Sequence, residues 1–164
     1  MNKLENRIET LANAAIIIAV LLSLGLGAYM FFPRGNSQPP DMKAGDRLPA
    51  TGIDWAKADQ TLVLVLQKGC HFCAESAPFY KRLTAAAAAS VSIAAALPGE
   101  RDESRAYLDE LGVKVSEIVK IDPGSLAIRG TPTLVLVDNQ GTITGVWAGK
   151  LGTEDEESVL RKIS

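Results

Sequence analysis

The sequence predicts an α/β domain, built as a mixed central sheet flanked by helices, with one transmembrane helix in front of it. Three short apolar runs, at residues 61–67, 91–97 and 133–138, have the continuous character of strands buried on both faces. Segments suited to helices lie between and after these runs, as a layered α/β domain requires. An uncharged stretch near the amino-terminal end is long enough to cross a bilayer.

Length and composition narrow the classes of protein that remain. The chain has 164 residues, which suits one ordinary domain plus an appendage. Its 17 basic and 19 acidic residues give a formal net charge of −2. No basic block is dense enough to grip a phosphate backbone, so no nucleic-acid partner is expected. The 2 cysteines lie within one four-residue stretch, which excludes a framework of structural disulfides.

The amino-terminal stretch is predicted to be a membrane anchor. No charged residue occurs from Thr10 to Pro33, and a helix of ~20 apolar residues spans the hydrocarbon core of a bilayer. A cleaved secretory signal is the alternative. Its best cleavage site is the Leu-Gly-Ala sequence at residues 26–28, where the leucine fits the small-residue rule badly.

These features divide the chain into four parts. We expect a flank at residues 1–11, a signal-anchor helix at 12–33, a linker at 34–42 and a compact domain at 43–164. The linker contains Gly, Asn, Ser and two prolines, a composition typical of an extended tether. Basic residues are nearly balanced on the two sides of the span, so charge does not decide its orientation. Placement of the domain outside the cytoplasm is expected from its chemistry.

Periodicity and capping signals predict the elements of the domain. A helix is expected from near Cys70 to about Ala89, and a second, amphipathic helix at 102–111 that ends at Gly112. The smaller elements expected next are a short strand or ambiguous segment at 113–119, a helical turn at 125–128, and a hairpin arm at 142–148 after a turn at 139–141. Thr153 is expected to cap the last helix, with Glu156 completing a capping box.

Cys70 and Cys73 are expected where the first strand joins the first helix. The N–H groups at a helix start favour negative charge, which biases Cys70 toward the thiolate, the reactive form of cysteine. Two intervening residues in a helical turn bring the two sulfurs within disulfide reach. Cys73 lies one turn into the helix and should be less exposed. The pattern predicts that Cys70 attacks as the nucleophile and that Cys73 resolves the mixed disulfide.

Three neighbours of the cysteines are expected to tune them. His71 would stabilise the thiolate and make the disulfide more oxidising, the alternative being an exposed turn residue. Lys68 would add to the same positive field unless it is simply solvated, and Phe72 lies between the cysteines. Structural zinc needs four ligands, and the chain offers two cysteines with one histidine between them. We therefore expect no metal and no cofactor other than the redox-active disulfide.

Several segments that follow the cysteine pair resemble the thioredoxin-like superfamily. Pro78 follows the second cysteine at the spacing of the proline that kinks the active-site helix in thioredoxins. Residues 128–134 (IRGTPTL) resemble the family's segment around its cis-proline, and 146–149 (VWAG) resemble its last strand. The resemblance covers the chain from about Gly45 to its end and implies a thioredoxin-like fold.

The resemblance also implies roles for the loop Gly130-Thr131-Pro132. In the family, the bond before this proline is cis, so Thr131–Pro132 is expected to be cis as well. The family's loop packs against the cysteine pair and offers backbone groups to an extended substrate strand.

Two further segments, at 45–49 (GDRLP) and about 99–123, resemble the redoxin branch, which includes membrane-anchored bacterial thiol–disulfide oxidoreductases. Two positions depart from ordinary thioredoxins. Leu64 stands where they have a buried aspartate, the usual proton acceptor for the second cysteine, and Gly69 stands where they have a tryptophan. Glu75 is a weak candidate for a substitute base.

The predicted function is thiol–disulfide exchange with protein thiols or disulfides outside the cytoplasm, with a separate redox partner that recycles the pair. Two alternatives stay open. In a redoxin-type thiol peroxidase, a threonine lies three residues before the peroxidatic cysteine. In this chain, Cys70 occupies that position before Cys73. A membrane-tethered binding module would need neither cysteine. The direction of electron flow is also open, because His71 argues for an oxidase or isomerase and the branch resemblance argues for a reductase.

Overall fold

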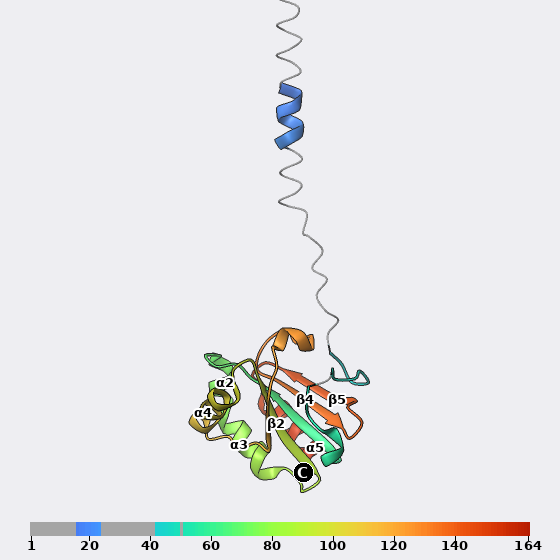
Figure 1. The fold of residues 1–164 in the computed structure, drawn as a ribbon, viewed down its shortest axis with the longest axis vertical. Helices are drawn as coiled ribbons and strands as arrows, with labels where there is room; N and C mark the ends of the chain where they lie inside the picture. The colour runs from blue at the N-terminus through green and yellow to red at the C-terminus, as the bar shows by residue number, and fades with distance from the viewer. Residues whose placement is uncertain (1–15, 24–41, 50) are drawn as a thin grey trace, which may run out of the picture. The chain divides into compact units, whose positions relative to one another are not determined.

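The computed structural model describes residues 16–23, 42–49 and 51–164 (Figure 1). The chain divides into two compact units, Met1–Ser37 and Gln38–Ser164. Within the first unit, residues 16–23 are helical, and the large apolar side chains of this helix are exposed. In the described residues, no helix is both long and apolar enough to cross a membrane.

Most of the amino-terminal predictions fall on residues that the structure does not describe. The predicted flank at 1–11 lies wholly outside the described residues. The predicted anchor at 12–33 is described only over its helical part at 16–23, and the predicted linker at 34–42 only at Met42. Anchor and linker therefore stay predictions.

The second unit is built on a five-stranded sheet with the order β3-β2-β1-β4-β5. Its strands are β1 (Gln60–Val65), β2 (Val91–Leu97), β3 (Glu117–Lys120), β4 (Thr133–Asp138) and β5 (Ile143–Ala148). Strand β2 runs parallel to both β1 and β3, whereas β4 is antiparallel to both β1 and β5. The predicted mixed sheet is confirmed, and its two edges are β3 and β5.

One face of the sheet is covered by helices. These are α2 (His71–Glu75), α3 (Ala77–Ala86), α4 (Arg101–Leu111) and α5 (Thr153–Ile163). Alternate residues of a strand point to opposite faces, and Leu62 and Leu64 of β1 point to this one. They share one buried cluster with Tyr80 of α3, Leu108 of α4 and Ile163 of α5.

The other face is covered by shorter segments. Val63 and Val65 of β1 pack there in a second buried cluster with Leu48, Ile53 and Leu126. The segment before β1 supplies Leu48, Ile53 and the short 3-10 helix η1 (Trp55–Lys57), while Leu126 belongs to the 3-10 helix η2 (Pro123–Leu126). Among the described residues, this cover contains no α-helix.

The first predicted helix is divided into α2 and α3 at Ser76. Pro78 lies in the first turn of α3 and has no N–H for the carbonyl of Ala74. The Ser76 hydroxyl donates to the carbonyl of Phe72 at 2.8 Å, which closes the end of α2. Pro78 was predicted to kink one continuous helix, and the structure instead divides that helix just before it.

The predicted capping box of the last helix is wrong. The N-cap of α5 is Gly152, Thr153 is its first helical residue, and no side chain caps it. The Glu156 carboxylate instead forms an ion pair with Arg82 on α3. This tertiary contact ties α5 to α3 and removes the glutamate from the role that the local pattern suggested.

Candidate active site

A tight turn carries the chain from the buried end of β1 to the first cysteine. The Leu66 side chain is buried and its N–H donates to the carbonyl of Ala96 in β2 at 3.0 Å, which continues the pairing beyond β1. Gly69 has φ = 80°, a backbone conformation that favours glycine. Gly69, which stands where ordinary thioredoxins have a tryptophan, therefore suits the conformation of this turn. The N–H of Cys70 donates back to Gln67 at 3.1 Å and ends the turn.

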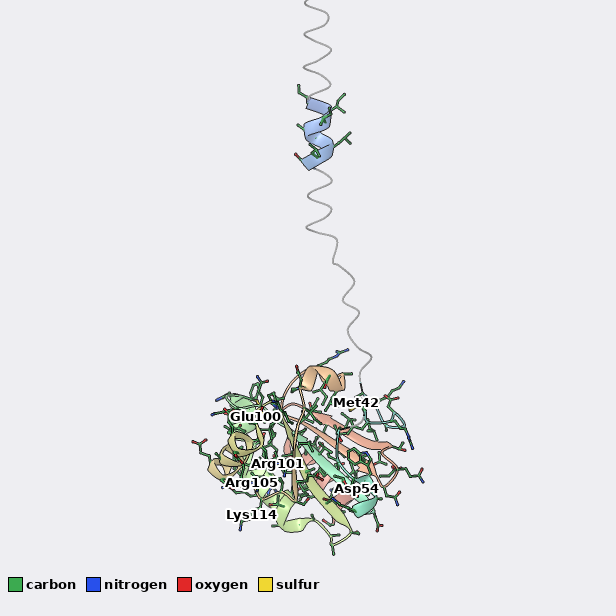
Figure 2. All side chains as sticks on the ribbon, viewed as in Figure 1. Met42, Asp54, Glu100, Arg101, Arg105 and Lys114 are labelled. Carbon is green, nitrogen blue, oxygen red and sulfur yellow. A yellow bond between two sulfur atoms is a disulfide. The ribbon has the colours of Figure 1, made fainter. Side chains whose placement is uncertain are left out.

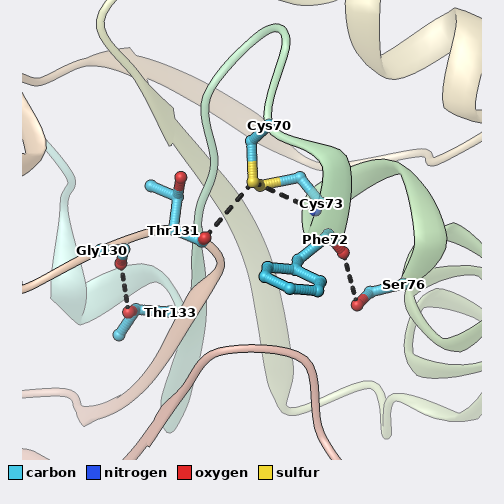
Figure 3. The surroundings of a disulfide bond; sticks show 7 residues. All are labelled: Cys70, Phe72, Cys73, Ser76, Gly130, Thr131 and Thr133. Atoms are coloured by element: carbon cyan, nitrogen blue, oxygen red, sulfur yellow. Dashed lines mark hydrogen bonds between the residues drawn. A yellow bond between two sulfur atoms is a disulfide. The ribbon is translucent and has the colours of Figure 1, made fainter.

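Cys70 and Cys73 form a disulfide with a Cα–Cα distance of 5.2 Å (Figure 3). Cys70 is the N-cap of α2, and its Sγ accepts a hydrogen bond from the Cys73 N–H at 3.1 Å. Cys73 is completely buried, whereas Cys70 is partly exposed. The predicted difference in exposure is confirmed.

The loop before β4 lies against Cys70. The Thr131–Pro132 bond is cis, as the resemblance implies. The carbonyl oxygen of Thr131 lies 3.3 Å from Cys70 Sγ (Figure 3). Because a disulfide sulfur has no proton, this contact becomes a hydrogen bond only when Cys70 is a protonated thiol. The structure thus brings together the two parts of the chain that the sequence analysis singled out, 61 residues apart.

Two hydrogen bonds hold this loop in place. The Thr133 hydroxyl donates to the carbonyl of Gly130 at 2.8 Å (Figure 3). The N–H of Gly149, just after β5, donates to the carbonyl of Pro132 at 2.7 Å. The loop is therefore fixed from both β4 and β5 while its Thr131 carbonyl faces the sulfur.

His71 pairs with Glu75 rather than with a cysteine. Its Nε2 lies 3.2 Å from a carboxylate oxygen of Glu75, and the other oxygen accepts a hydrogen bond from Lys150 Nζ at 2.9 Å. Lys150 and, more weakly, His71 lower the pKa of Glu75. A carboxylate held by two basic groups is a poor proton acceptor, which argues against Glu75 as the base for Cys73. Lys150 was not singled out by the sequence analysis, and only its place just after Gly149 hinted at a role.

The other predicted tuning residues lie in different surroundings. Lys68 Nζ forms an ion pair with Glu103 of α4 at 3.0 Å, which offsets the positive charge predicted near Cys70. Phe72 is 53% exposed and is the one large exposed hydrophobic side chain in the described part of the domain. A tuning role for His71, Lys68 or Phe72 stays a prediction.

The surroundings of Cys73 are apolar on the side of the sheet. Leu64 is fully buried in the same cluster as Cys73, so the place of the thioredoxin aspartate is filled by a hydrocarbon side chain. In the described residues, no group of three or more His, Cys, Asp or Glu side chains is arranged to hold a metal ion. The arrangement supports thiol–disulfide chemistry at the sulfurs of Cys70 and Cys73.

No protein-family model matches the sequence, and no curated protein matches it either. Solved structures match the fold. The chain is similar to the thioredoxin domain of a thiol-disulfide oxidoreductase from Bacteroides vulgatus, with a TM-score of 0.57 and 20% identity over 76% of this chain and 100% of that one. For a thiol-disulfide isomerase from Corynebacterium glutamicum, the TM-score is 0.54 and the identity 17%, over 75% and 93% of the two chains. For a thiol:disulfide interchange protein from Bacteroides sp., the values are 0.53 and 22%, over 74% and 91%.

The chain shares the architecture of these neighbours over 74% to 76% of its length. Its mixed sheet carries a cysteine pair after β1 and a cis-proline before β4, as the resemblance predicted. The chain therefore has the thioredoxin-like fold.

Proposed function

We propose that this protein is a thiol–disulfide oxidoreductase that acts on protein substrates through Cys70 and Cys73. One observation carries the proposal. The partly exposed Cys70 is joined to the fully buried Cys73, and Cys70 Sγ lies beside the carbonyl of Thr131. This geometry gives the two sulfurs unequal access to a substrate, which a two-step exchange requires. The names of the similar structures, which include oxidoreductase, isomerase and interchange protein, support the same class of reaction.

In the reducing direction, the Cys70 thiolate attacks one sulfur of a substrate disulfide. A Cys70–substrate bond forms, the substrate S–S bond breaks, and one substrate sulfur leaves as a thiolate that takes up a proton. Cys73 then loses its proton and attacks Cys70 Sγ, which releases the second substrate sulfur as a thiolate. Two electrons pass to the substrate, its two thiolates take up one proton from Cys73 and one from water, and the Cys70–Cys73 disulfide is restored. The oxidising direction is the reverse, with a substrate dithiol as the electron donor.

The backbone supports the first step at Cys70. The N–H of Cys73 donates to Cys70 Sγ at 3.1 Å, and a charged sulfur accepts such a bond more strongly than a neutral one. The bond therefore favours the thiolate as attacking group and as leaving group. Glu75, the carboxylate of α2, is held by Lys150 and His71. We therefore do not assign removal of the Cys73 proton to it.

We also propose that the domain works outside the cytoplasm, held to a membrane by the amino-terminal segment. The support is the absence of charge from Thr10 to Pro33 and the exposed apolar side chains of the helix at 16–23. A redox-active disulfide also persists more readily in extracytoplasmic compartments. A reporter fused to the carboxyl-terminal end tests this placement. Reporter activity confined to the cytoplasm would contradict it.

Reduction of insulin disulfides by the full chain in detergent micelles, with dithiothreitol as electron donor, tests the activity. We expect catalysed reduction by the natural chain and none above background with Cys70→Ser. The matched variant Cys73→Ser should form the mixed disulfide but turn over slowly. Equal rates for the natural chain and Cys70→Ser would contradict the proposal, and rapid stoichiometric consumption of hydrogen peroxide would favour the peroxidase alternative.

The reduction potential separates the two directions. Equilibration of the Cys70–Cys73 pair with glutathione buffers gives this value directly. A potential of about −120 mV indicates an oxidant, and one of about −270 mV a reductant.

A further inference from the structure

The edge strand β5 is covered along only part of its length. Near its start, Gly45 N–H donates to the carbonyl of Ile143 at 2.8 Å, and Ile143 N–H donates to the carbonyl of Asp46 at 2.8 Å. A bulge follows, where the register with β4 shifts between Leu136 and Val137. The segment before β1 therefore pairs with the beginning of the edge.

The second half of β5 presents backbone groups outward. Gly149 N–H points to β4, because it donates to Pro132 at 2.7 Å. Backbone groups of successive residues in a strand alternate in direction, so Trp147 also faces β4 while Val146 and Ala148 face away from it. Within the described residues, no backbone hydrogen bond reaches these outward groups of Val146 and Ala148. An edge of this kind is a template for one more strand.

A cavity of about 540 Å³ opens beside the same part of β5. Its volume lies within the range of roughly 300 to 1,000 Å³ that is usual for binding pockets. Its lining includes the apolar side chains of Met42, Ile128, Val146 and Ala148, and its two charged side chains are Lys43 and Arg129. Figure 2 labels Met42 near the orange turn of η2, and Met42 packs against the buried cluster that contains Leu126 of η2. The cavity therefore combines an apolar floor with two cationic groups.

The cavity reaches the loop that faces the reactive sulfur. Its lining residues Arg129 and Thr133 are each two positions from Thr131, whose carbonyl is 3.3 Å from Cys70 Sγ. Two residues span at most about 7.6 Å between Cα atoms. A strand that leaves the sulfur at about 3.3 Å per residue reaches the cavity in about three to four residues.

We propose that the outer edge of β5 and this cavity form a docking site for the substrate polypeptide. The occupant is an extended segment of the substrate, bonded to the backbone of Val146 and Ala148, with an apolar side chain in the cavity. An acidic residue next to the apolar one complements Lys43. The inference rests on the proposed function, because the docked segment carries the cysteine that reacts with Cys70.

Two synthetic peptides test the docking site, used with the full reduced chain in detergent micelles. Each has one cysteine blocked as a mixed disulfide with glutathione. About four residues from it, a distance set by the strand rise, one carries Leu-Glu and the other Ser-Lys. The readout is the ratio of the two second-order rate constants. We expect a ratio of about ten for the natural chain, which corresponds to about 1.4 kcal/mol.

Two variants locate the effect. Ala148→Pro removes the outward N–H without removing a bond to β4, and proline is tolerated at such edge positions. Its ratio should fall to about one, whereas Ala148→Ser keeps the N–H and should keep the natural ratio. Lys43→Glu changes an exposed side chain and should lower the ratio if Ala148→Pro fails to fold. A natural ratio near one, or a ratio unchanged in both Ala148→Pro and Lys43→Glu, would overturn the docking site.

The same experiment separates this inference from the proposed function. Reaction of the natural chain with oxidised glutathione, but without preference between the peptides, overturns the docking site alone. No reaction with any disulfide overturns the proposed function. Self-association of the natural chain that Ala148→Pro abolishes would show that a second copy covers the edge, which also overturns the substrate assignment.

Discussion

Reduction of the Cys70–Cys73 disulfide changes the stability of the fold through two opposed effects. The disulfide closes a loop of four residues, since the cysteines are three apart. In the chain-entropy model, a loop of this size stabilises the oxidised fold by about 1.9 kcal/mol. Reduction removes that contribution.

The reduced fold gains a different interaction. Once Cys70 is ionised, its thiolate accepts the hydrogen bond from the Cys73 N–H, which in the oxidised form reaches a neutral sulfur at 3.1 Å. A hydrogen bond to a charged group contributes about 1.5 to 3 kcal/mol. The two effects offset each other, so we expect the unfolding free energies of the two forms to agree within about 1 kcal/mol.

Urea unfolding of the oxidised and reduced chain, followed by the fluorescence of Trp55 and Trp147, measures the difference. At acidic pH, Cys70 is a protonated thiol, so the contribution of the charge is lost while the thiol donates to the Thr131 carbonyl. The oxidised form should then become the more stable one, by at most the loop contribution of about 1.9 kcal/mol. Cys70→Ser, which has neither the disulfide nor the thiolate, controls for the reducing agent. A reduced form that is less stable by about 2 kcal/mol at every pH would refute the argument for a stabilised thiolate.

Two further predictions concern residues around the site. Lys150→Gln removes the main cause of the lowered pKa of Glu75, so a carbon NMR titration of that carboxyl should show its pKa rising. In the natural chain, the stabilisation by this pair is present above the ordinary carboxyl range and is lost as pH falls through the lowered pKa, and an unchanged titration would contradict the pairing. Gly112→Ala places a side chain at φ = 66° and should cost about 1 to 2 kcal/mol in urea unfolding. An added Cβ at Gly112 also meets Lys81 Cε at 2.8 Å, the far end of a flexible side chain that can move aside. Gly130→Ala is the control, because Gly130 has no positive φ and an added Cβ there meets nothing within 4 Å, and equal costs for the two variants would exclude the backbone explanation.

The sheet and the cysteine pair follow closely from local sequence. The predicted strands at 91–97 and 133–138 coincide with β2 and β4, because strands buried on both faces leave an unbroken apolar run. The CxxC sequence also predicts its own geometry, since its residues lie within one turn of helix. The short strand β3 (Glu117–Lys120) was only ambiguous, because its end residues are not buried and interrupt the apolar pattern.

Contacts between distant segments account for what the sequence did not predict. Glu156 satisfies the capping pattern locally, but Arg82, 74 residues away, takes its carboxylate. Lys68 was expected to add charge near Cys70, and its pairing with Glu103, 35 residues away, could not be read from spacing. The His71–Glu75 pair differs, because an i,i+4 spacing on a helix predicts such a contact.

The central claim is that Cys70 is the attacking sulfur and Cys73 the resolving one. Trapping the mixed disulfide tests it most directly. Reduced Cys73→Ser is mixed with insulin, quenched with acid and digested, and the cross-linked peptides are identified by mass spectrometry. The account predicts a Cys70–insulin disulfide with Cys73→Ser and no cross-link with Cys70→Ser. A cross-link at Cys73 in the Cys70→Ser chain, formed as fast as the one at Cys70, would contradict the assignment.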